Sequence, residues 1–91
     1  MTTKQKKLQD TSVETNLGSS KKLVLFNDNV NTFEFVIKTL MEVCGHDPFQ
    51  AENCALIAHF KGKCIVKKGT LEDLKYYYNE MILRKLTVEI Q

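Results

Sequence analysis

Apolar residues recur along the chain with two different spacings, which predict strands in some segments and helices in others. A continuous apolar run at residues 23–26 is typical of a buried strand, and a shorter run at residues 64–66 predicts a second strand. Residues 86–90 alternate between apolar and polar with period two, as expected for a half-buried third strand. The remaining apolar positions between residues 33 and 82 follow the i, i+3, i+4, i+7 spacing of helices.

Capping residues divide this helical part into three helices. Asn31, Asp47 and Thr70 each precede a helical pattern, where a short polar side chain can accept a hydrogen bond from the first backbone amides. Gly45 and Gly62 follow the first two patterns and are expected to end them. One face of the second helix is unusually small, which allows close packing or leaves volume for a ligand. That face consists of Ala51, Cys54, Ala55, Ala58 and His59.

The predicted order β-α-α-β-α-β indicates an α+β fold. We expect a two-layer sandwich in which three helices cover one face of a three-stranded antiparallel sheet. Residues 21–91 would form this core domain. Residues 1–20 are rich in polar residues and contain too few large apolar ones to form a core, so they are expected to be a flexible, disordered N-terminal extension.

The composition restricts the classes of function that this chain can serve. With 91 residues and a net charge of +2, it lacks the strong positive field typical of nucleic-acid-binding or membrane-binding proteins. It also lacks an export signal and an apolar segment of the roughly 18 residues that span a bilayer. Cys44, Cys54 and Cys64 are odd in number and are interpreted as reduced thiols. We therefore expect a cytoplasmic protein, and a monomer.

Three polar residues form a candidate site at the ends of predicted elements. Asn27 and Asp28 follow the first strand, and His59 lies in the last turn of the second helix. Each alone has a structural explanation, since Asn and Asp form turns and a histidine near a helix C-terminus compensates the helix dipole. Together, an amide, a carboxylate and a neutral imidazole can accept the hydrogen bonds of a primary ammonium. The three residues therefore indicate recognition and not catalysis.

No other cluster indicates catalysis, a metal or a cofactor. The cysteines and histidines lack the paired spacing of a tetrahedral zinc site, and no nucleophile has a base at a characteristic spacing. Four lysines lie around the second predicted strand: Lys61, Lys63, Lys67 and Lys68. Lysines in such a position can contact an acidic partner or nucleic acid, but they more often protect a strand edge from aggregation. We therefore expect no enzyme activity, no cofactor and no nucleic-acid partner.

Residues 25–36 and residues 59–64 resemble the two signature blocks of the ClpS adaptor family, at matching separation. Gln50-Ala51 and residues 69–72 fit the same pattern, so the resemblance covers residues 21–91. It implies a non-enzymatic adaptor that binds N-degron substrates, whose destabilising first residue is Phe, Tyr, Trp or Leu. The adaptor would deliver them for degradation to a ClpA- or ClpC-like AAA+ unfoldase and its protease, and its flexible tail would engage the unfoldase.

The resemblance also implies a role for each candidate residue. Asn27 and His59 would bond the substrate's α-amino group, and Asp28 would assist through its charge, directly or through water. The pocket for the first side chain would be lined by Asn31, Phe33, Val36, Ala55 and Leu86. The identity of the unfoldase and the action of the tail do not follow from the resemblance.

The chain departs from the pattern common in bacterial members of the family in and beside this candidate site. Asn29 replaces the usual second Asp, which removes one charge near the site. Asn31-Thr32-Phe33 replaces a typical Thr-Pro-Met, and Ala55 occupies a position where Met is frequent. A smaller residue at the floor predicts a deeper pocket that favours Phe, Tyr and Trp over Leu.

Two alternative functions are compatible with parts of the sequence. The same element order resembles the C-terminal domain of the ribosomal stalk protein, a factor-binding module, but that domain does not require Asn27, Asp28 and His59 together. The lysines around the second strand are compatible with a domain that binds acidic partners or nucleic acid weakly. Binding of that kind would fall steeply with salt concentration.

Overall fold

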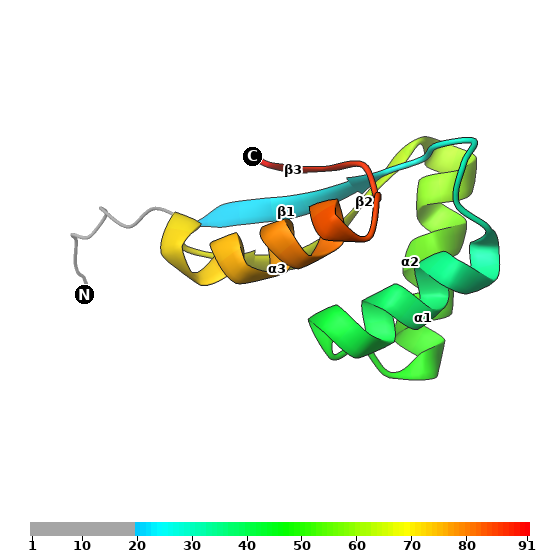
Figure 1. Cartoon of the computed structure of the whole chain (residues 1–91), viewed down its shortest axis with the longest axis horizontal. Helices are drawn as coiled ribbons and strands as arrows, with labels where there is room; N and C mark the ends of the chain where they lie inside the picture. Colours follow the sequence, from blue (N-terminus) through cyan, green and yellow to red (C-terminus); the bar gives the residue numbers. More distant parts are fainter. Residues whose placement is uncertain (1–19) are drawn as a thin grey trace, which may run out of the picture.

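The elements of the computed structural model follow the predicted order β-α-α-β-α-β (Figure 1). The structure describes residues 20–91, so the predicted disordered extension lies outside the described residues, apart from Ser20. The elements are β1 (Lys21–Phe26), α1 (Phe33–Cys44), α2 (Pro48–Lys61), β2 (Lys63–Gly69), α3 (Leu71–Leu83) and β3 (Val88–Ile90). The α+β fold with a three-stranded antiparallel sheet is thus confirmed.

β1 is the central strand of the sheet, which has the order β2-β1-β3. Leu25 pairs with Cys64 of β2 on one side and with Val88 of β3 on the other. Leu23, Val24 and Leu25 are each at most 2% exposed. The strand is therefore buried on both faces, which explains why its sequence is continuously apolar and does not alternate.

A β-bulge interrupts the pairing of β1 with β2. Leu23 pairs with Lys67 and Val24 with Ile65, so the intervening Val66 has no partner in the ladder. The carbonyl oxygen of Val66 instead lies 2.9 Å from Nε2 of the buried His46. His46 therefore satisfies a backbone group that the bulge leaves free, which gives this histidine a structural role.

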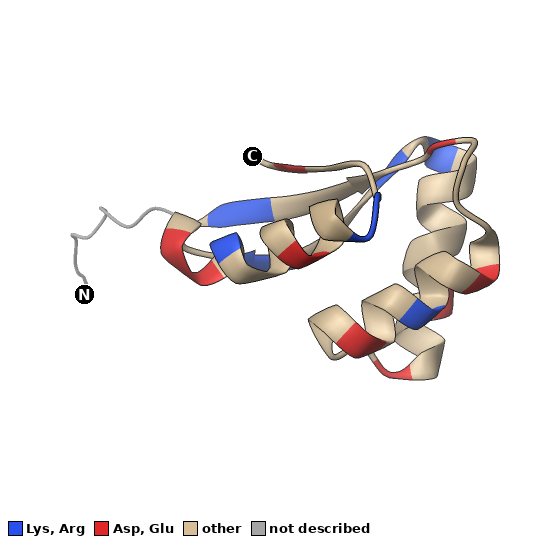
Figure 2. Ribbon diagram, viewed as in Figure 1, with Lys and Arg blue, Asp and Glu red and all other residues tan. Residues whose placement is uncertain are grey.

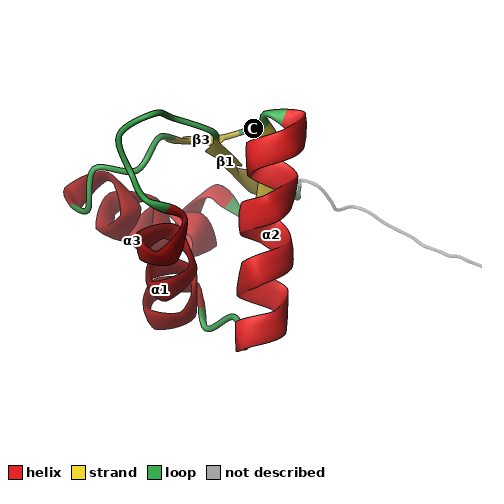
Figure 3. Ribbon diagram, turned by 90° about the vertical axis from the view of Figure 1, so that its right-hand side faces the viewer, coloured by secondary structure: helices red, strands yellow, loops and turns green. Residues whose placement is uncertain are grey.

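The helices form the second layer, on one side of the sheet (Figure 1). α3 runs along the strands, whereas α1 and α2 lie at one end of them (Figure 1). Figure 3 shows α1 and α2 side by side as a helical hairpin. The core between the layers is a single cluster, and its large side chains that are at most 2% exposed are Leu23, Leu25, Leu40, Leu74 and Met81. Burial of each such side chain contributes about 1.5–3 kcal/mol.

The predicted small face of α2 is buried apart from His59, which is exposed, and three of its residues pack in this core. Ala51, Cys54 and Ala58 belong to the core cluster, and each is at most 4% exposed. Because the distance between packed elements depends on the side chains at their contact, small residues let α2 lie close to its neighbours. In α1, Val43 is buried while Met41 is 38% exposed.

Charged residues of both signs are spread over the surface and do not gather into one field (Figure 2). α1 and α3 carry charges along their length, whereas most of α2 is uncharged (Figure 2). Arg84 and Glu42 form an ion pair at 2.9 Å that joins the end of α3 to α1. Within residues 20–91, no helix combines the length and hydropathy needed to cross a membrane.

The start of α1 differs from the prediction. Thr32, and not Asn31, is the N-cap, and its hydroxyl accepts a hydrogen bond of 3.1 Å from the Phe35 amide. The side chain of Asn31 instead donates to the Asp28 carboxylate and to the Lys85 carbonyl, both at 3.0 Å. Since this side chain is used in tertiary contacts, the cap falls to the next residue.

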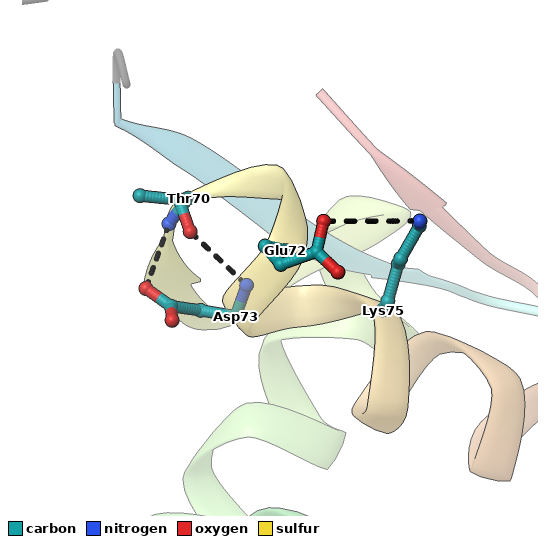
Figure 4. A network of polar contacts seen from close by, with 4 residues as sticks. All are labelled: Thr70, Glu72, Asp73 and Lys75. Carbon is teal, nitrogen blue, oxygen red and sulfur yellow. Dashed lines mark hydrogen bonds and ion pairs between the residues drawn. The ribbon is translucent and has the colours of Figure 1, made fainter. Parts of the chain in front are cut away.

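The other two predicted caps are confirmed. Asp47 begins α2 and accepts a backbone amide hydrogen bond of 2.8 Å. At the start of α3, Thr70 and Asp73 form a reciprocal capping box, with hydrogen bonds of 3.0 and 3.1 Å (Figure 4). Figure 4 also shows Glu72 and Lys75 paired at 3.8 Å. Both side chains of this pair are exposed, so it adds little stability.

α1 and α2 end at glycines in the left-handed conformation, as predicted, whereas α3 is followed by a lysine in that conformation. Lys85 has a φ of 70°. Its amide donates to the Ile82 carbonyl at 2.9 Å, and the Leu86 amide donates to the Met81 carbonyl at 3.0 Å. This Schellman turn places Leu86 in the core. The last strand therefore begins at Val88 and not at Leu86, as the sequence pattern had predicted.

We expect Lys85→Gly to raise the free energy of unfolding by about 0.5–1 kcal/mol. The left-handed conformation costs a residue with a Cβ roughly 1–2 kcal/mol, and the greater unfolded-state entropy of glycine offsets part of the gain. Urea denaturation followed by circular dichroism measures the change. Lys85→Ala removes the same charge but keeps the Cβ, so it should give no gain. A Lys85→Gly variant no more stable than Lys85→Ala would contradict the expectation.

Candidate functional site

A cavity of about 430 Å³ lies where the β1–α1 loop meets the C-terminal half of α2. Its size falls within the range of roughly 300–1,000 Å³ that is typical of ligand pockets. The residues predicted for the site all line it: Asn27, Asp28, Asn31, Phe33, Val36, Ala55, His59 and Leu86. The fold thus brings together residues from the β1–α1 loop, α1, α2 and the connection between α3 and β3.

A backbone hydrogen bond holds Asn27 against the end of α2. The Asn27 amide donates to the Gly62 carbonyl at 2.9 Å, so the chain leaving β1 lies beside the last turn of α2. His59 belongs to that turn, and its ring contacts Phe60 edge-on with ring centroids 4.8 Å apart. Asn27 and His59 are both exposed, and neither side chain hydrogen-bonds to another side chain or backbone group within residues 20–91. Both can therefore accept hydrogen bonds from a ligand in the cavity.

The Asp28 carboxylate holds the β1–α1 loop in shape. One of its oxygens accepts hydrogen bonds from the amides of Val30 and Asn31, at 3.0 and 2.9 Å. The other accepts from the Asn31 side chain at 3.0 Å and from the Thr87 hydroxyl at 3.4 Å. The Asn31 side chain also donates to the Lys85 carbonyl at 3.0 Å. These contacts, which we call the Asp28 network, join the β1–α1 loop to the connection between α3 and β3.

The Asp28 network also keeps this carboxylate ionised. Partial burial raises the pKa of Asp28, but the hydrogen bonds from Asn31, Val30 and Thr87 outweigh that effect and hold the pKa below its usual value. The ion pairs found within residues 20–91 do not include Asp28. None of the described residues that line the cavity is Lys or Arg. The polar side of the cavity therefore carries a negative charge that is not paired with a Lys or Arg of the lining.

The apolar side of the cavity has a buried floor and a more exposed rim. Ala55 and Leu86 are 4% and 3% exposed, whereas Phe33 and Val36 are half-buried. The cavity also has lining residues that were not predicted from the sequence, namely Leu25, Phe26, Asn29, Leu56, Ala58 and Phe60. Helical spacing could have indicated Ala58, since residues three and four apart on a helix share a face.

A second hollow, of about 290 Å³, shares no lining residue with the first cavity. It is lined by His46, Phe49, Gln50, Asn53, Cys54, Ile57, Cys64 and Ile65. Although it contains a histidine and two cysteines, no group of three His, Cys, Asp or Glu side chains within residues 20–91 is placed to hold a metal ion.

The cavity lies in the part of the chain that matches a known family. The family model described as ATP-dependent Clp protease adaptor protein ClpS matches residues 18–86, a range that contains every lining residue of the cavity. The chain belongs to the ClpS family. Members of this family are adaptors of the ATP-dependent Clp protease, which agrees with a site built for recognition.

Solved structures have the same fold. The structure of Agrobacterium tumefaciens ClpS2 bound to L-phenylalaninamide is similar to this ClpS-family chain with a TM-score of 0.73. The similarity covers 79% of this chain and 94% of that chain at 20% sequence identity, so it concerns the arrangement of the elements. A comparison with curated protein sequences gave no match.

We expect Asp28→Asn to destabilise the fold at neutral pH by about 1–2 kcal/mol, because the four donors that bond this side chain lose a charged acceptor. A carboxylate with a lowered pKa stabilises the fold above its unfolded pKa of about 3.9, and this contribution is lost as the pH falls through the lowered value. The difference in unfolding free energy between the parent protein and Asp28→Asn should therefore be largest near pH 7 and shrink below about pH 4.

Urea denaturation at several pH values measures this difference. Glu52→Gln is the matched control, because Glu52 is an exposed carboxylate of α2 that lines neither cavity. Its unfolding free energy should follow that of the parent protein at every pH. A destabilisation by Asp28→Asn that is the same at pH 3 and pH 7 would show that the charge of Asp28 does not stabilise the loop.

Proposed function

We propose that this ClpS-family protein binds N-degron substrates through their free α-amino group and a bulky first side chain, and delivers them to a Clp unfoldase for degradation. The accepted first residues are Phe, Tyr, Trp and Leu. The observation that carries the proposal is one cavity that combines uncharged hydrogen-bond acceptors, an ionised carboxylate and an apolar floor. Because the ammonium group and the side chain of an N-terminal residue leave the same carbon atom, one small site can recognise both.

The polar side of the cavity suits an ammonium group. The Asn27 side-chain oxygen and a neutral His59 each accept one of its hydrogens, and a water near Asp28 accepts the third. The oxygens of Asp28 already accept four hydrogen bonds from the chain, so this residue acts mainly through its charge. The C-terminal end of α2, beside Asn27, adds the negative end of a helix dipole.

The apolar side of the cavity suits an aromatic side chain. Ala55 at the floor leaves depth, and Phe33 and Val36 surround the entrance with apolar surface. Burial of a Phe side chain there would contribute about 1.5–3 kcal/mol. ClpS2 of Agrobacterium tumefaciens, which shares the fold, has been solved with L-phenylalaninamide, a ligand with a free amino group and a phenyl side chain. We infer the same ligand class for this chain.

Delivery requires a partner, and the ATP-dependent Clp protease of the family description supplies its class. A ClpA- or ClpC-like AAA+ unfoldase is the proposed partner, and residues 1–20 are the proposed segment that engages it. The adaptor would act as a cytoplasmic monomer and would catalyse no reaction itself. Degradation of a reporter protein with an N-terminal Phe by an unfoldase and its protease, with and without this chain, tests delivery separately from binding.

We expect a fluorescent peptide with a free N-terminal Phe to bind with low-micromolar affinity or better. Acetylation of its amino group should cost on the order of 2–5 kcal/mol, because the charge is lost while the acceptors stay desolvated. Affinity should also fall above about pH 8.5, where the α-amino group, with a pKa of about 7.7–8.0, loses its proton. Fluorescence anisotropy measures both effects. Equal affinity for the free and acetylated peptides would exclude recognition of the amino group.

Asn27→Ala and His59→Ala should each weaken binding of the free peptide more than tenfold, about 1.4 kcal/mol or more, because each removes one acceptor of an ammonium hydrogen. Asn53→Ala is the matched control, since Asn53 is an exposed amide of α2 that lines the second hollow and not the first cavity. Its affinity should equal that of the parent protein. Weak binding that depends steeply on salt and not on the first residue would instead favour the acidic-partner or nucleic-acid alternative.

We expect the parent protein to prefer Phe over Leu as the first residue, and Ala55→Met to reduce this preference. Methionine adds volume at the floor, so a planar ring would lose more contact than the shorter Leu side chain. Affinities for Phe, Tyr, Trp and Leu peptides measured on both proteins check the expectation. A parent protein that prefers Leu would contradict the deeper pocket. Ile57→Met, at a position on the same helix that is 43% exposed and does not line the cavity, controls for the added sulfur.

A further inference from the structure

Two cysteines of different elements meet at the second hollow. Cys54 lies on α2 and Cys64 on β2, and their Sγ atoms are 2.7 Å apart. This separation exceeds the length of a disulfide bond, about 2.05 Å, by less than an ångström. Cys54 is 4% exposed, whereas Cys64 is half-buried, and both line the second hollow. Both thiols are free in the structure.

We propose that Cys54 and Cys64 are a redox-sensitive pair that peroxide oxidises to a reversible disulfide. The bond would require only a small approach of the two sulfur atoms, since the fold already holds them in contact. Disulfides in reducing compartments are usually transient, so a pair of this kind would be reduced under ordinary conditions and oxidised during peroxide stress. The proposal does not depend on the N-degron function.

The two thiols have different parts in the reaction. Burial raises the pKa of Cys54 well above its usual value, and the hydrogen bond with Cys64 adds to this effect, so Cys54 is not the first sulfur to react. It keeps its proton until Cys64 has been oxidised, and this proton then leaves with the hydroxyl group of the sulfenic acid as water. Cys64 is the more exposed of the two and is the one that peroxide reaches. Its sulfur attacks hydrogen peroxide and gives a sulfenic acid and one water. Cys54 then attacks that sulfur, the S–S bond forms, and a second water leaves.

This stoichiometry is balanced without any further reactant. Two thiols lose two electrons and two protons, and one molecule of hydrogen peroxide accepts them to give two molecules of water. A small-molecule thiol reverses the reaction by thiol–disulfide exchange. Hydrogen peroxide can reach Cys64 through the second hollow, which shares no lining residue with the first cavity. An occupied first cavity would therefore not block oxidation.

The disulfide would constrain one wall of the first cavity. The residues that α2 contributes to that cavity lie between the two cysteines: Ala55, Leu56, Ala58, His59 and Phe60. A bond from Cys54 to Cys64 closes this segment into a short loop, from the middle of α2 to the start of β2. Closing a loop of that length lowers the conformational entropy of the unfolded chain. It also restricts local opening of this segment in the folded chain.

The test treats the full chain with hydrogen peroxide and then labels remaining thiols with N-ethylmaleimide under denaturing conditions. Intact mass should show one maleimide where the reduced protein has three, and peptide mapping should place the S–S bond between Cys54 and Cys64. The midpoint of thermal unfolding should rise by roughly 10 °C or more. Amide hydrogen exchange in residues 55–61 should slow, and dithiothreitol should reverse all of these changes.

Cys44 provides the matched control. It is 6% exposed, burial raises its pKa to about 11, and its Sγ atom lies 3.8 Å from the Met81 sulfur and not against another thiol. Cys44→Ala should therefore oxidise like the parent protein, whereas Cys64→Ser should show no S–S bond within the chain and no thermal gain. Cys64 is only half-buried, so this variant is expected to fold. Three maleimides after peroxide, oxidation of Cys64 to a sulfinic acid, or a bond that includes Cys44 would each overturn the proposal.

Discussion

A carboxylate whose oxygens are both bonded by the surrounding chain holds together the two connections that shape the cavity. Asp28 and Asn31 link the β1–α1 loop to the segment after α3, through the Thr87 hydroxyl and the Lys85 carbonyl. Because the Asn31 side chain is used in this way, α1 is capped by Thr32. The cap sets the first turn of α1, and this turn carries Phe33 and Val36 to the rim of the cavity. The Asp28 network therefore determines both polar and apolar parts of the site.

The small residues of α2 serve the core and the cavity together. Ala51 and Cys54 pack in the core and do not line the first cavity, whereas Ala58 belongs to the core cluster and also lines that cavity. Ala55 is 4% exposed and forms the floor. A small helix face allows either close packing or volume for a ligand, and α2 shows both. A larger residue at one of these positions would act on the stability of the core and on the pocket at once.

Local signals in the sequence predicted most of the fold. Capping residues such as Asp47 and Thr70, the terminating glycines and the apolar run of β1 act within a few residues, so they can be recognised without the rest of the chain. The features that were missed depend on distant residues. The bond from Asn31 to Lys85 spans 54 positions, and the late start of β3 follows from the left-handed conformation of Lys85, where a glycine would be expected.

Most of the candidate site was also predicted from the sequence, whereas its contacts between distant residues were not. Asn27, Asp28 and His59 were recognised from their chemistry and from the resemblance to the ClpS family. Their residue types alone did not show that the Asp28 oxygens already accept four hydrogen bonds from the rest of the chain. Aromatic residues such as Phe60 were missed because an exposed aromatic side chain has no distinctive sequence pattern.

The hydrogen bonds that the Asp28 oxygens already accept affect how such a site would discriminate between ligands. With the Asp28 oxygens occupied and Asn29 in place of a second acid, the proposed site would attract a cation by charge but bind its hydrogens through neutral acceptors. An acetylated amine keeps one N–H and loses its charge, so it would leave Asn27 or His59 without a partner. An unsatisfied acceptor in a desolvated site costs more free energy than a satisfied hydrogen bond contributes. Selectivity for a free N-terminus would therefore depend on that penalty as much as on attraction to the carboxylate.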